Sequence, residues 1–167
     1  MTDSNGSGLS EYIMTALLQL MEKKRFDQVS ITELCEKAGV SRMTFYRSFD
    51  GKTDVLRKKC AAITDEFVRT SGISYRKDPL RSYFTKLFTH LLNNRETALL
   101  LLRDGLLWVV KDDIDRVFLT AYAGVYEEYK TRFITGGIFD VYRLWLENGC
   151  RETPEEMALR LSAILEK

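Results

Sequence analysis

The stretch AGVSRMTFYRSF, residues 38–49, combines the end of one short helix with the whole of another. Gly39 stands where a left-handed residue ends a helix, and Ser41 stands where a side chain caps the next one. At about 100° per residue, Phe45 and Phe49 lie on one edge of the second helix, and the polar and cationic groups lie away from them. The pattern therefore predicts a helix with one buried edge and one polar edge.

The segment ahead of this stretch has the signals of two more helices. Leu9 to Arg25 carries apolar residues at spacings of three and four, which is typical of an amphipathic helix. Ser30 and Glu33 have the spacing of a capping box, in which each side chain satisfies a backbone N–H at a helix start. The helix that begins there ends at Gly39. Two short helices joined by a tight glycine-containing turn are typical of the helix-turn-helix motif.

The second helix of this motif carries the groups that we expect to contact DNA. In the motif, the N-terminal half of the second helix enters the major groove. Side chains at its start can meet base edges, arginine above all guanine, while later ones lie near phosphates. Ser30 lies at a helix N-terminus, which favours an anion. The predicted DNA contacts are Ser30, Ser41, Arg42, Met43, Thr44, Tyr46, Arg47 and Lys52.

Two observations favour DNA binding over a bundle that merely packs against another domain. A packing helix would not expose a polar and cationic set as dense as that between Arg42 and Arg47. Residues 21–59 contain ten Lys or Arg against six Asp or Glu, whereas the whole chain has a net charge of only +1. Because a basic cluster is often only a solvated surface, the charge supports the interpretation without establishing it.

The chain lacks the motifs of metal, nucleotide and common catalytic sites. Its one histidine is His90, and its three cysteines have no metal-ligand spacing. It has no glycine-rich phosphate loop and no zinc-binding histidine pair. The longest apolar runs, 98–102 and 106–110, are too short to span a bilayer. We therefore expect a cytoplasmic protein without cofactor, metal or enzymatic activity, the least favoured alternative being a small helical enzyme that uses His90.

The segment SITELCEKAGVSRMTFYRSFDGKTDVL, residues 30–56, resembles the DNA-binding pattern of the tetracycline-repressor (TetR) family. The shared features are a small polar residue before an apolar-periodic helix, the sequence AGVS, a TxYxxF-like core and a lysine just beyond. The resemblance implies that Tyr46 and Lys52 contact phosphates. It implies equally that residues 42–44 read bases.

The organisation of the chain follows from helical patterning and from this resemblance. Proline occurs only at positions 79 and 154, and no stretch shows sustained alternation with turn dipeptides, so we expect an all-α protein. Residues 1–8 have the composition of a disordered tail. Residues 9–56 are expected to form the helix-turn-helix domain, and residues 57–167 a helical domain that binds an effector and dimerises.

The C-terminal segment GGIFDVYRLWLENGCRETPEEMALRLSAIL, residues 136–165, resembles that of one branch of TetR-like regulators. Within it, Thr153 to Glu156 has an N-cap, a proline at the first helical position and a capping-box spacing. The resemblance implies a dimer in which two helices of each protomer form a four-helix bundle. Periodicity alone fits an ordinary core nearly as well. The predicted interface residues are Ile138, Tyr142, Trp145, Leu146, Leu161 and Leu165.

Between these two regions, residues 60–134 have helical patterns rich in aromatic side chains. The resemblance implies an effector pocket among these helices. The candidate ligand contacts are Phe84, Phe88, Trp108, Phe118, Tyr122 and Tyr126. Aromatic residues at helical spacing are more often core than ligand cage, and the domain is short, so a small or absent pocket is an open alternative.

Together these patterns predict a homodimeric, sequence-specific regulator of transcription. The leading hypothesis is a repressor that binds a palindromic operator in double-stranded DNA and is released by a small molecule. The alternative hypothesis is a TetR-like adaptor or coactivator that acts through a protein partner instead of a small-molecule ligand. Neither hypothesis involves a membrane.

Overall fold

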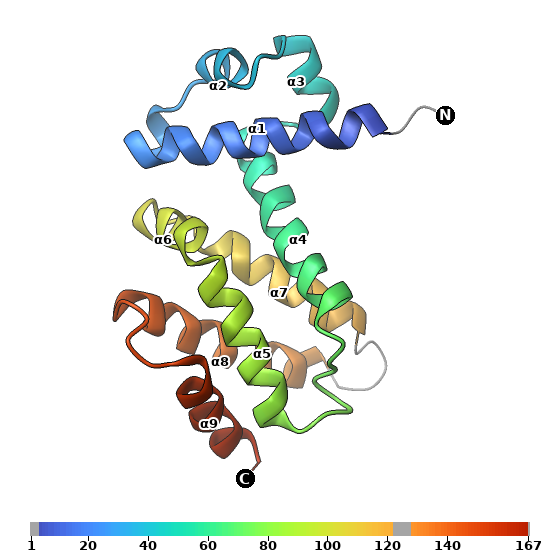
Figure 1. The fold of residues 1–167 in the computed structure, drawn as a ribbon, viewed down its shortest axis with the longest axis vertical. Coiled ribbons are helices and arrows are strands. Elements are labelled where there is room, and N and C mark those ends of the chain that lie inside the picture. The colour runs from blue at the N-terminus through green and yellow to red at the C-terminus, as the bar shows by residue number, and fades with distance from the viewer. Residues whose placement is uncertain (1–3, 122–127, 167) are drawn as a thin grey trace. The chain divides into compact units, whose positions relative to one another are not determined.

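The computed structural model describes residues 4–121 and 128–166, and every regular element within these ranges is a helix (Figure 1). The predicted all-α fold is confirmed. The helices are α1 (Ser4–Lys23), η1 (Phe26–Gln28), α2 (Ile31–Ala38), α3 (Arg42–Ser48), α4 (Lys52–Thr70), α5 (Leu80–Asn93), α6 (Arg95–Arg103), α7 (Trp108–Ala121), α8 (Glu128–Glu147) and α9 (Pro154–Leu165). Among these described helices, none combines the length and the apolarity that a membrane crossing requires.

The chain divides into two compact units, Met1–Cys60 and Ala61–Lys167. The division falls inside α4, a few residues beyond the predicted domain boundary at residue 56. α1 begins at Ser4, so the helix is longer at its start than the expected range from Leu9. Serine and asparagine, which the composition assigned to a tail, are also common at helix starts.

The first unit is a three-helix arrangement in which α1 packs against α2 and α2 against α3. Its core consists of apolar side chains from all three helices and from the start of α4. The largest of them are Ile13, Leu17, Met21, Leu34, Phe45, Phe49 and Leu56, all essentially inaccessible to solvent. Phe45 of α3 and Phe49, the C-cap of this helix, are both buried with their ring centroids 5.7 Å apart, so the predicted buried edge is confirmed.

The second unit is a helical bundle in which α5 packs extensively along α9, and α7 along α8. Its core is rich in aromatic rings. Phe88 of α5 meets Trp145 of α8 edge-on at 5.2 Å, and the Trp145 indole N–H donates to the carbonyl of Glu152 at 3.1 Å. These contacts tie the loop before α9 to α8, and α8 to α5. The second unit is therefore held together by rings from distant parts of the sequence.

A buried polar contact joins α7 to α8. The hydroxyl of Thr135, a fully buried residue, donates to the carboxylate of Asp115, which also pairs with Lys111 and Arg132. Burial alone would raise the pKa of Asp115, but the hydrogen bonds from Lys111 and Thr135 and the neighbouring positive charges lower it. The carboxylate is thus held ionised between two helices that line the interior of the bundle.

Candidate nucleic-acid interface and interior cavity

The first helix of the motif, α2, begins after Ser30 and ends at Gly39 as its sequence predicts, but only the serine half of the predicted capping box forms. Ser30 is the N-cap, and its hydroxyl accepts a hydrogen bond from the Glu33 N–H at 3.1 Å. The Glu33 carboxylate also accepts from Lys24, and this hydrogen bond outweighs burial and lowers the pKa of Glu33. Gly39 adopts the left-handed conformation, with φ of 67°, that ends the helix. α2 is therefore fixed at both ends by local hydrogen bonds.

The second helix, α3, is capped by Ser41, as predicted. The Ser41 hydroxyl accepts from the Thr44 N–H at 3.0 Å and hydrogen-bonds the Thr44 hydroxyl at 2.9 Å. These two polar side chains are thus used in part to form the helix start. The capping orders a seven-residue helix that would be unstable alone in water.

The outward edge of α3 is formed by exposed side chains of mixed chemistry. Met43 is 84% exposed and Tyr46 49% exposed, and Arg42 and Arg47 are also exposed. Neither guanidinium makes an ion pair or hydrogen bond with any residue that the structure describes. An apolar thioether, a phenol and two guanidinium groups therefore project together from one short helix, which matches the needs of a groove-reading surface.

Lys52, at the start of α4, lies differently from the other predicted contacts. Its side chain is half-buried, and its ammonium donates to the carbonyl oxygens of Phe26, at 2.8 Å, and Val29. The ammonium also lies 4.6 Å from the centroid of the Phe26 ring. Burial lowers the pKa of Lys52. The charge therefore faces the connector between α1 and α2, whereas Ser30 nearby is exposed.

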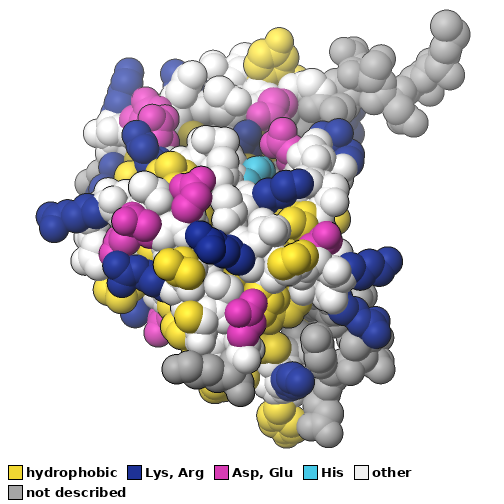
Figure 2. Space-filling model, turned by 60° about the horizontal axis from the view of Figure 1, so that its bottom comes forward, with side chains coloured by type: hydrophobic (Ala, Val, Ile, Leu, Met, Phe, Trp, Pro, Cys, Tyr) yellow, Lys and Arg dark blue, Asp and Glu magenta, His cyan; other side chains and the backbone are white. Residues whose placement is uncertain are grey.

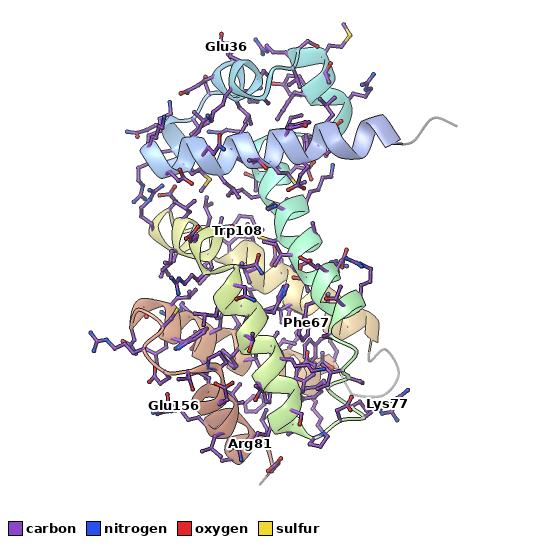
Figure 3. The ribbon with its side chains drawn as sticks, in the orientation of Figure 1. Glu36, Phe67, Lys77, Arg81, Trp108 and Glu156 are labelled. Carbon is purple, nitrogen blue, oxygen red and sulfur yellow. The ribbon has the colours of Figure 1, made fainter. Side chains whose placement is uncertain are left out.

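The second unit contains a small interior cavity of about 70 Å³ among α4, α5, α7 and α8. Phe67 of α4, labelled in Figure 3, lines it and packs edge-on against Tyr83 at 6.0 Å. The His90 ring nitrogen Nε2 donates to the carbonyl of Ile63 at 2.9 Å, because a carbonyl oxygen can only accept. The remaining lining is mostly apolar, from Leu87, Leu91, Val110, Ile114, Val117, Phe118, Ile138 and Tyr142.

The candidate ligand contacts are only partly brought together at this cavity. Phe118 lines it, whereas Phe84 and Phe88 are fully buried in the surrounding core. Trp108 lies at the start of α7, 39% exposed, away from the cavity lining (Figure 3). Tyr122 and Tyr126 lie outside the described residues. The cavity is formed instead largely by aliphatic side chains, because the rings in this unit pack mainly against one another.

Phe67, Tyr83 and His90 are cavity residues that the sequence pattern did not single out. Helical phase was the available signal, since Tyr83, Leu87, His90 and Leu91 recur at the spacing of one α5 face. Phase shows that a face is buried, but it does not show that four such faces leave a space between them.

The predicted dimer-interface residues lie largely inside the protomer, which corrects that assignment. Ile138, Tyr142, Trp145, Leu146 and Leu161 are each at most 4% exposed, and only Leu165 is half-buried. The physical reason is that α9 packs along α5, and α8 along α7, so the apolar stripes of the last two helices are covered within one chain.

A different apolar surface remains on α8 and α9. A groove of about 400 Å³ lies between them, bordered by Phe133 and Ile164, which are 80% and 65% exposed. Gly136 and Gly137 form part of it, and a methyl group added at either glycine would meet nothing within 4 Å. Exposed hydrophobic side chains are also visible among charged ones in the space-filling view (Figure 2).

Comparisons with known proteins give consistent matches. Residues 13–58 match the model of the bacterial regulatory proteins of the tetR family. Residues 78–167, more than half of the chain, match a model described as a transcriptional regulator C-terminal region. The solved structure of the fatty acid degradation regulator FadR from Bacillus halodurans has a TM-score of 0.60 at 15% identity, with 93% of each chain covered, and this likeness shows the fold. No curated protein gives a significant match.

Proposed function

Because the chain belongs to the TetR family of bacterial transcriptional regulators, we propose that this DNA-binding protein is a homodimeric repressor of a palindromic operator, released by a small effector. The observation that carries the proposal is the outward edge of α3, where Arg42, Met43, Tyr46 and Arg47 are exposed on a helix whose other edge is buried. An exposed set of this composition has no role in the core of the first unit.

The residues of α3 divide into two groups by position. Arg42 and Met43 stand at its N-terminal end, where a helix in the major groove meets base edges; arginine suits guanine, and a thioether suits the methyl group of thymine. Tyr46 and Arg47 lie one turn later, where hydroxyl and guanidinium groups bind phosphates. Ser41, Thr44 and Ser30 are the remaining proposed contacts, with their hydroxyls shared between the helix caps and DNA.

Dimerisation is proposed because one short helix reads few base pairs. Two copies placed about 34–36 Å apart would read two half-sites of a palindrome. The groove bordered by Phe133 and Ile164 supports an interface through α8 and α9, since exposed apolar side chains of this size favour burial and the glycine pair leaves room for close approach. Phe133→Asp should shift the protein to monomer in analytical ultracentrifugation. Leu144→Asp, on the same helix but outside the groove, should leave the dimer intact.

The interior cavity is the proposed effector site. An effector would lower operator affinity if it bound more tightly to a dimer whose two α3 helices are wrongly spaced for DNA. The loss would equal the difference between the effector's binding free energies for that form and for the DNA-binding form. The apolar lining favours an apolar ligand, which is compatible with the fatty acid regulator as a relative in fold. Ordinary ligand pockets measure about 300–1,000 Å³. A cavity of about 70 Å³ must therefore widen to admit such a molecule.

This small volume also supports a second candidate function. A regulator with a nearly filled interior could respond to a protein partner that binds the α8–α9 groove, instead of to a metabolite. Co-purification from native cells separates the two candidates, since a stoichiometric complex with a different protein would favour the adaptor.

The experiment that tests the proposed function is selection of genomic DNA fragments by the purified protein at moderate salt, followed by footprinting. A protected palindrome would support the dimeric repressor. Arg42→Ala is selected in parallel as a comparison, and its bound fragments should show a weaker preference at one position of the half-site. A salt-sensitive smear without a preferred site would contradict operator recognition and would move the adaptor to first place.

A further inference from the structure

His90 lies on the wall of the interior cavity and is fixed there through one of its two ring nitrogens. It belongs to α5, is half-buried, and donates from Nε2 to the Ile63 carbonyl of α4 at 2.9 Å. Its ring also packs against Phe67, with the ring centroids 5.3 Å apart. A neutral imidazole carries one N–H, so a proton on Nε2 leaves Nδ1 with a lone pair that can only accept a hydrogen bond.

The other ring nitrogen, Nδ1, has no hydrogen-bond partner among the residues that the structure describes. Within the same residues, the fully buried side-chain polar atom without a partner is Oδ2 of Asp113, so Nδ1 of His90 is not sealed inside the protein. The chain has one histidine, and its side chain is visible at the surface in the space-filling view (Figure 2). His90 therefore belongs both to the cavity wall and to the surface, and it offers an open acceptor.

The other polar side chains of the cavity wall are less available. They are the hydroxyl-bearing Thr64, Tyr83 and Tyr142, and none of these residues is without a partner in the chain. The remainder of the wall is apolar, so a ligand that fills the cavity must be largely apolar as well. A single open acceptor on an apolar wall matches a ligand with one polar group, and that group must be a hydrogen-bond donor.

We propose that the effector is a small, mainly apolar molecule with one hydroxyl group, an alcohol or a phenol, and that this hydroxyl donates to Nδ1 of His90. The proposal rests on the effector site proposed above and specifies the ligand of that site. A carboxylate fits less well, because it has no proton to donate to a lone pair. Through Nε2 the same ring contacts α4, the helix within which the chain divides into its two units, so His90 would join the bound ligand to this helix.

Three para-substituted toluenes of similar size test the ligand class: p-cresol with a hydroxyl, p-xylene with a methyl and p-toluate with a carboxylate. Isothermal titration calorimetry of the wild-type protein without DNA, at about pH 8 where a histidine side chain is generally neutral, measures the three affinities. A phenol keeps its proton at this pH. We expect p-cresol to bind at least as tightly as p-xylene, although its hydroxyl must leave water, and p-toluate to bind most weakly. Tighter binding of p-xylene or p-toluate, or no binding of p-cresol, would overturn the proposal.

A variant of the histidine separates ligand recognition from a purely structural role. His90→Phe keeps a flat ring and removes the acceptor, so the ratio of p-cresol to p-xylene affinity should fall about tenfold, as expected for one hydrogen bond. A structural role alone would weaken both ligands equally, and an unchanged ratio would therefore contradict the proposal. Thr64→Val removes a hydroxyl from the α4 side of the same wall and should leave the ratio as in the wild type. A fall in the ratio for Thr64→Val instead of His90→Phe would assign the ligand hydroxyl to Thr64 and overturn the assignment.

A spectrum of the wild-type protein covers the case in which His90→Phe does not fold. Because the chain has one histidine, labelling with nitrogen-15 histidine gives one pair of ring signals in NMR of protein purified without a histidine tag. The free protein should carry the ring proton on Nε2, and p-cresol should shift the Nδ1 signal more than p-xylene does. A proton on Nδ1 in the free protein, or an Nδ1 signal that p-cresol leaves unchanged, would also overturn the proposal. Absence of any operator complex would instead contradict the proposed function, since none of these measurements uses DNA.

Discussion

The two units of the chain use their characteristic side chains in opposite ways. In the first unit, the arginines and the tyrosine of α3 are exposed, and its short helices are held by caps and by a few buried phenylalanines. In the second unit, the aromatic rings are mostly buried against one another, as Phe88 and Trp145 are. Phe84 and Phe88, two of the rings that suggested a ligand cage, are fully buried in this core.

This difference shows where a residue type by itself is informative. An exposed arginine on a capped helix contributes little to the stability of the fold, so its charge and hydrogen-bond donors indicate a binding partner. A tryptophan in a helical bundle is usually part of the core, because burying its large apolar surface stabilises the fold. The comparison therefore predicts that single substitutions in the first unit change DNA binding, whereas those in the second unit change stability.

The largest expected effect belongs to Trp145, which is 1% exposed. Trp145→Ala should lower the free energy of unfolding of the second unit by about 3–5 kcal/mol, since it leaves a cavity and breaks the hydrogen bond to Glu152. Chemical denaturation followed by circular dichroism measures the loss. Trp108→Ala is the matched control, because that ring is 39% exposed and should cost much less. Equal losses for the two variants would break the comparison.

The next largest effect is a change in specificity without a change in stability. Arg42→Ala should relax preference at one position of the operator half-site by about 1–3 kcal/mol, because one base contact is lost. The free energy of unfolding should stay within about 0.5 kcal/mol of the wild type. Binding to a panel of single-base operator variants measures both affinity and preference. A uniform loss over the whole panel would move Arg42 to the phosphate contacts.

Two helix caps allow the same chemical change to be compared in both units. Ser41→Ala and Thr153→Ala should each cost about 1 kcal/mol of stability, because each removes the oxygen that accepts a backbone N–H at a helix start. Only Ser41→Ala should also weaken operator binding, since it loosens α3. Thermal unfolding and gel-shift titration of both variants check this. If Thr153→Ala weakened DNA binding as strongly, stability alone would explain the effect.

These caps also show why the ends of several helices could be predicted from the sequence. The signals of Ser30, Gly39, Ser41 and Thr153 each act over three or four residues, so the pattern contains the whole interaction. The helix-turn-helix and the buried edge of α3 were predicted for the same reason. Local hydrogen bonds and helical phase determine these features, and both depend only on residues that are close together in the sequence.

Long-range packing decided the features that the sequence did not reveal. The stripe containing Tyr142 and Trp145 was assigned to a dimer interface, although periodicity alone fits a core nearly as well. In the structure, Phe88 of α5, which is distant in the sequence, packs edge-on against Trp145 at 5.2 Å. The same holds for Lys52, since nothing near α4 in the sequence shows that its side chain turns back to Val29. Which face meets which neighbour depends on the whole bundle.

The smallest expected effect compares two tyrosines, one from each unit. Tyr46→Phe keeps the ring, which meets Phe45 edge-on at 5.3 Å, and removes only an exposed hydroxyl. Operator affinity should fall by about 0.5–1.5 kcal/mol on every sequence, as expected for one hydrogen bond to a phosphate. The salt slope should not change, because a neutral hydroxyl releases no counterion. Titrations at several salt concentrations, on operator and on unrelated DNA, measure both quantities.

The matched change in the second unit is Tyr142→Phe, at a ring that is 2% exposed. Its hydroxyl lies in the interior, so its removal should alter the free energy of unfolding and leave the operator affinity of the folded protein unchanged. A Tyr46→Phe variant that lost affinity for only one operator sequence would place this phenol on a base instead of a phosphate. The contrast between an exposed, functional phenol and a buried, structural one would still hold, but the boundary between base-reading and phosphate-binding residues on α3 would move one turn toward its C-terminus.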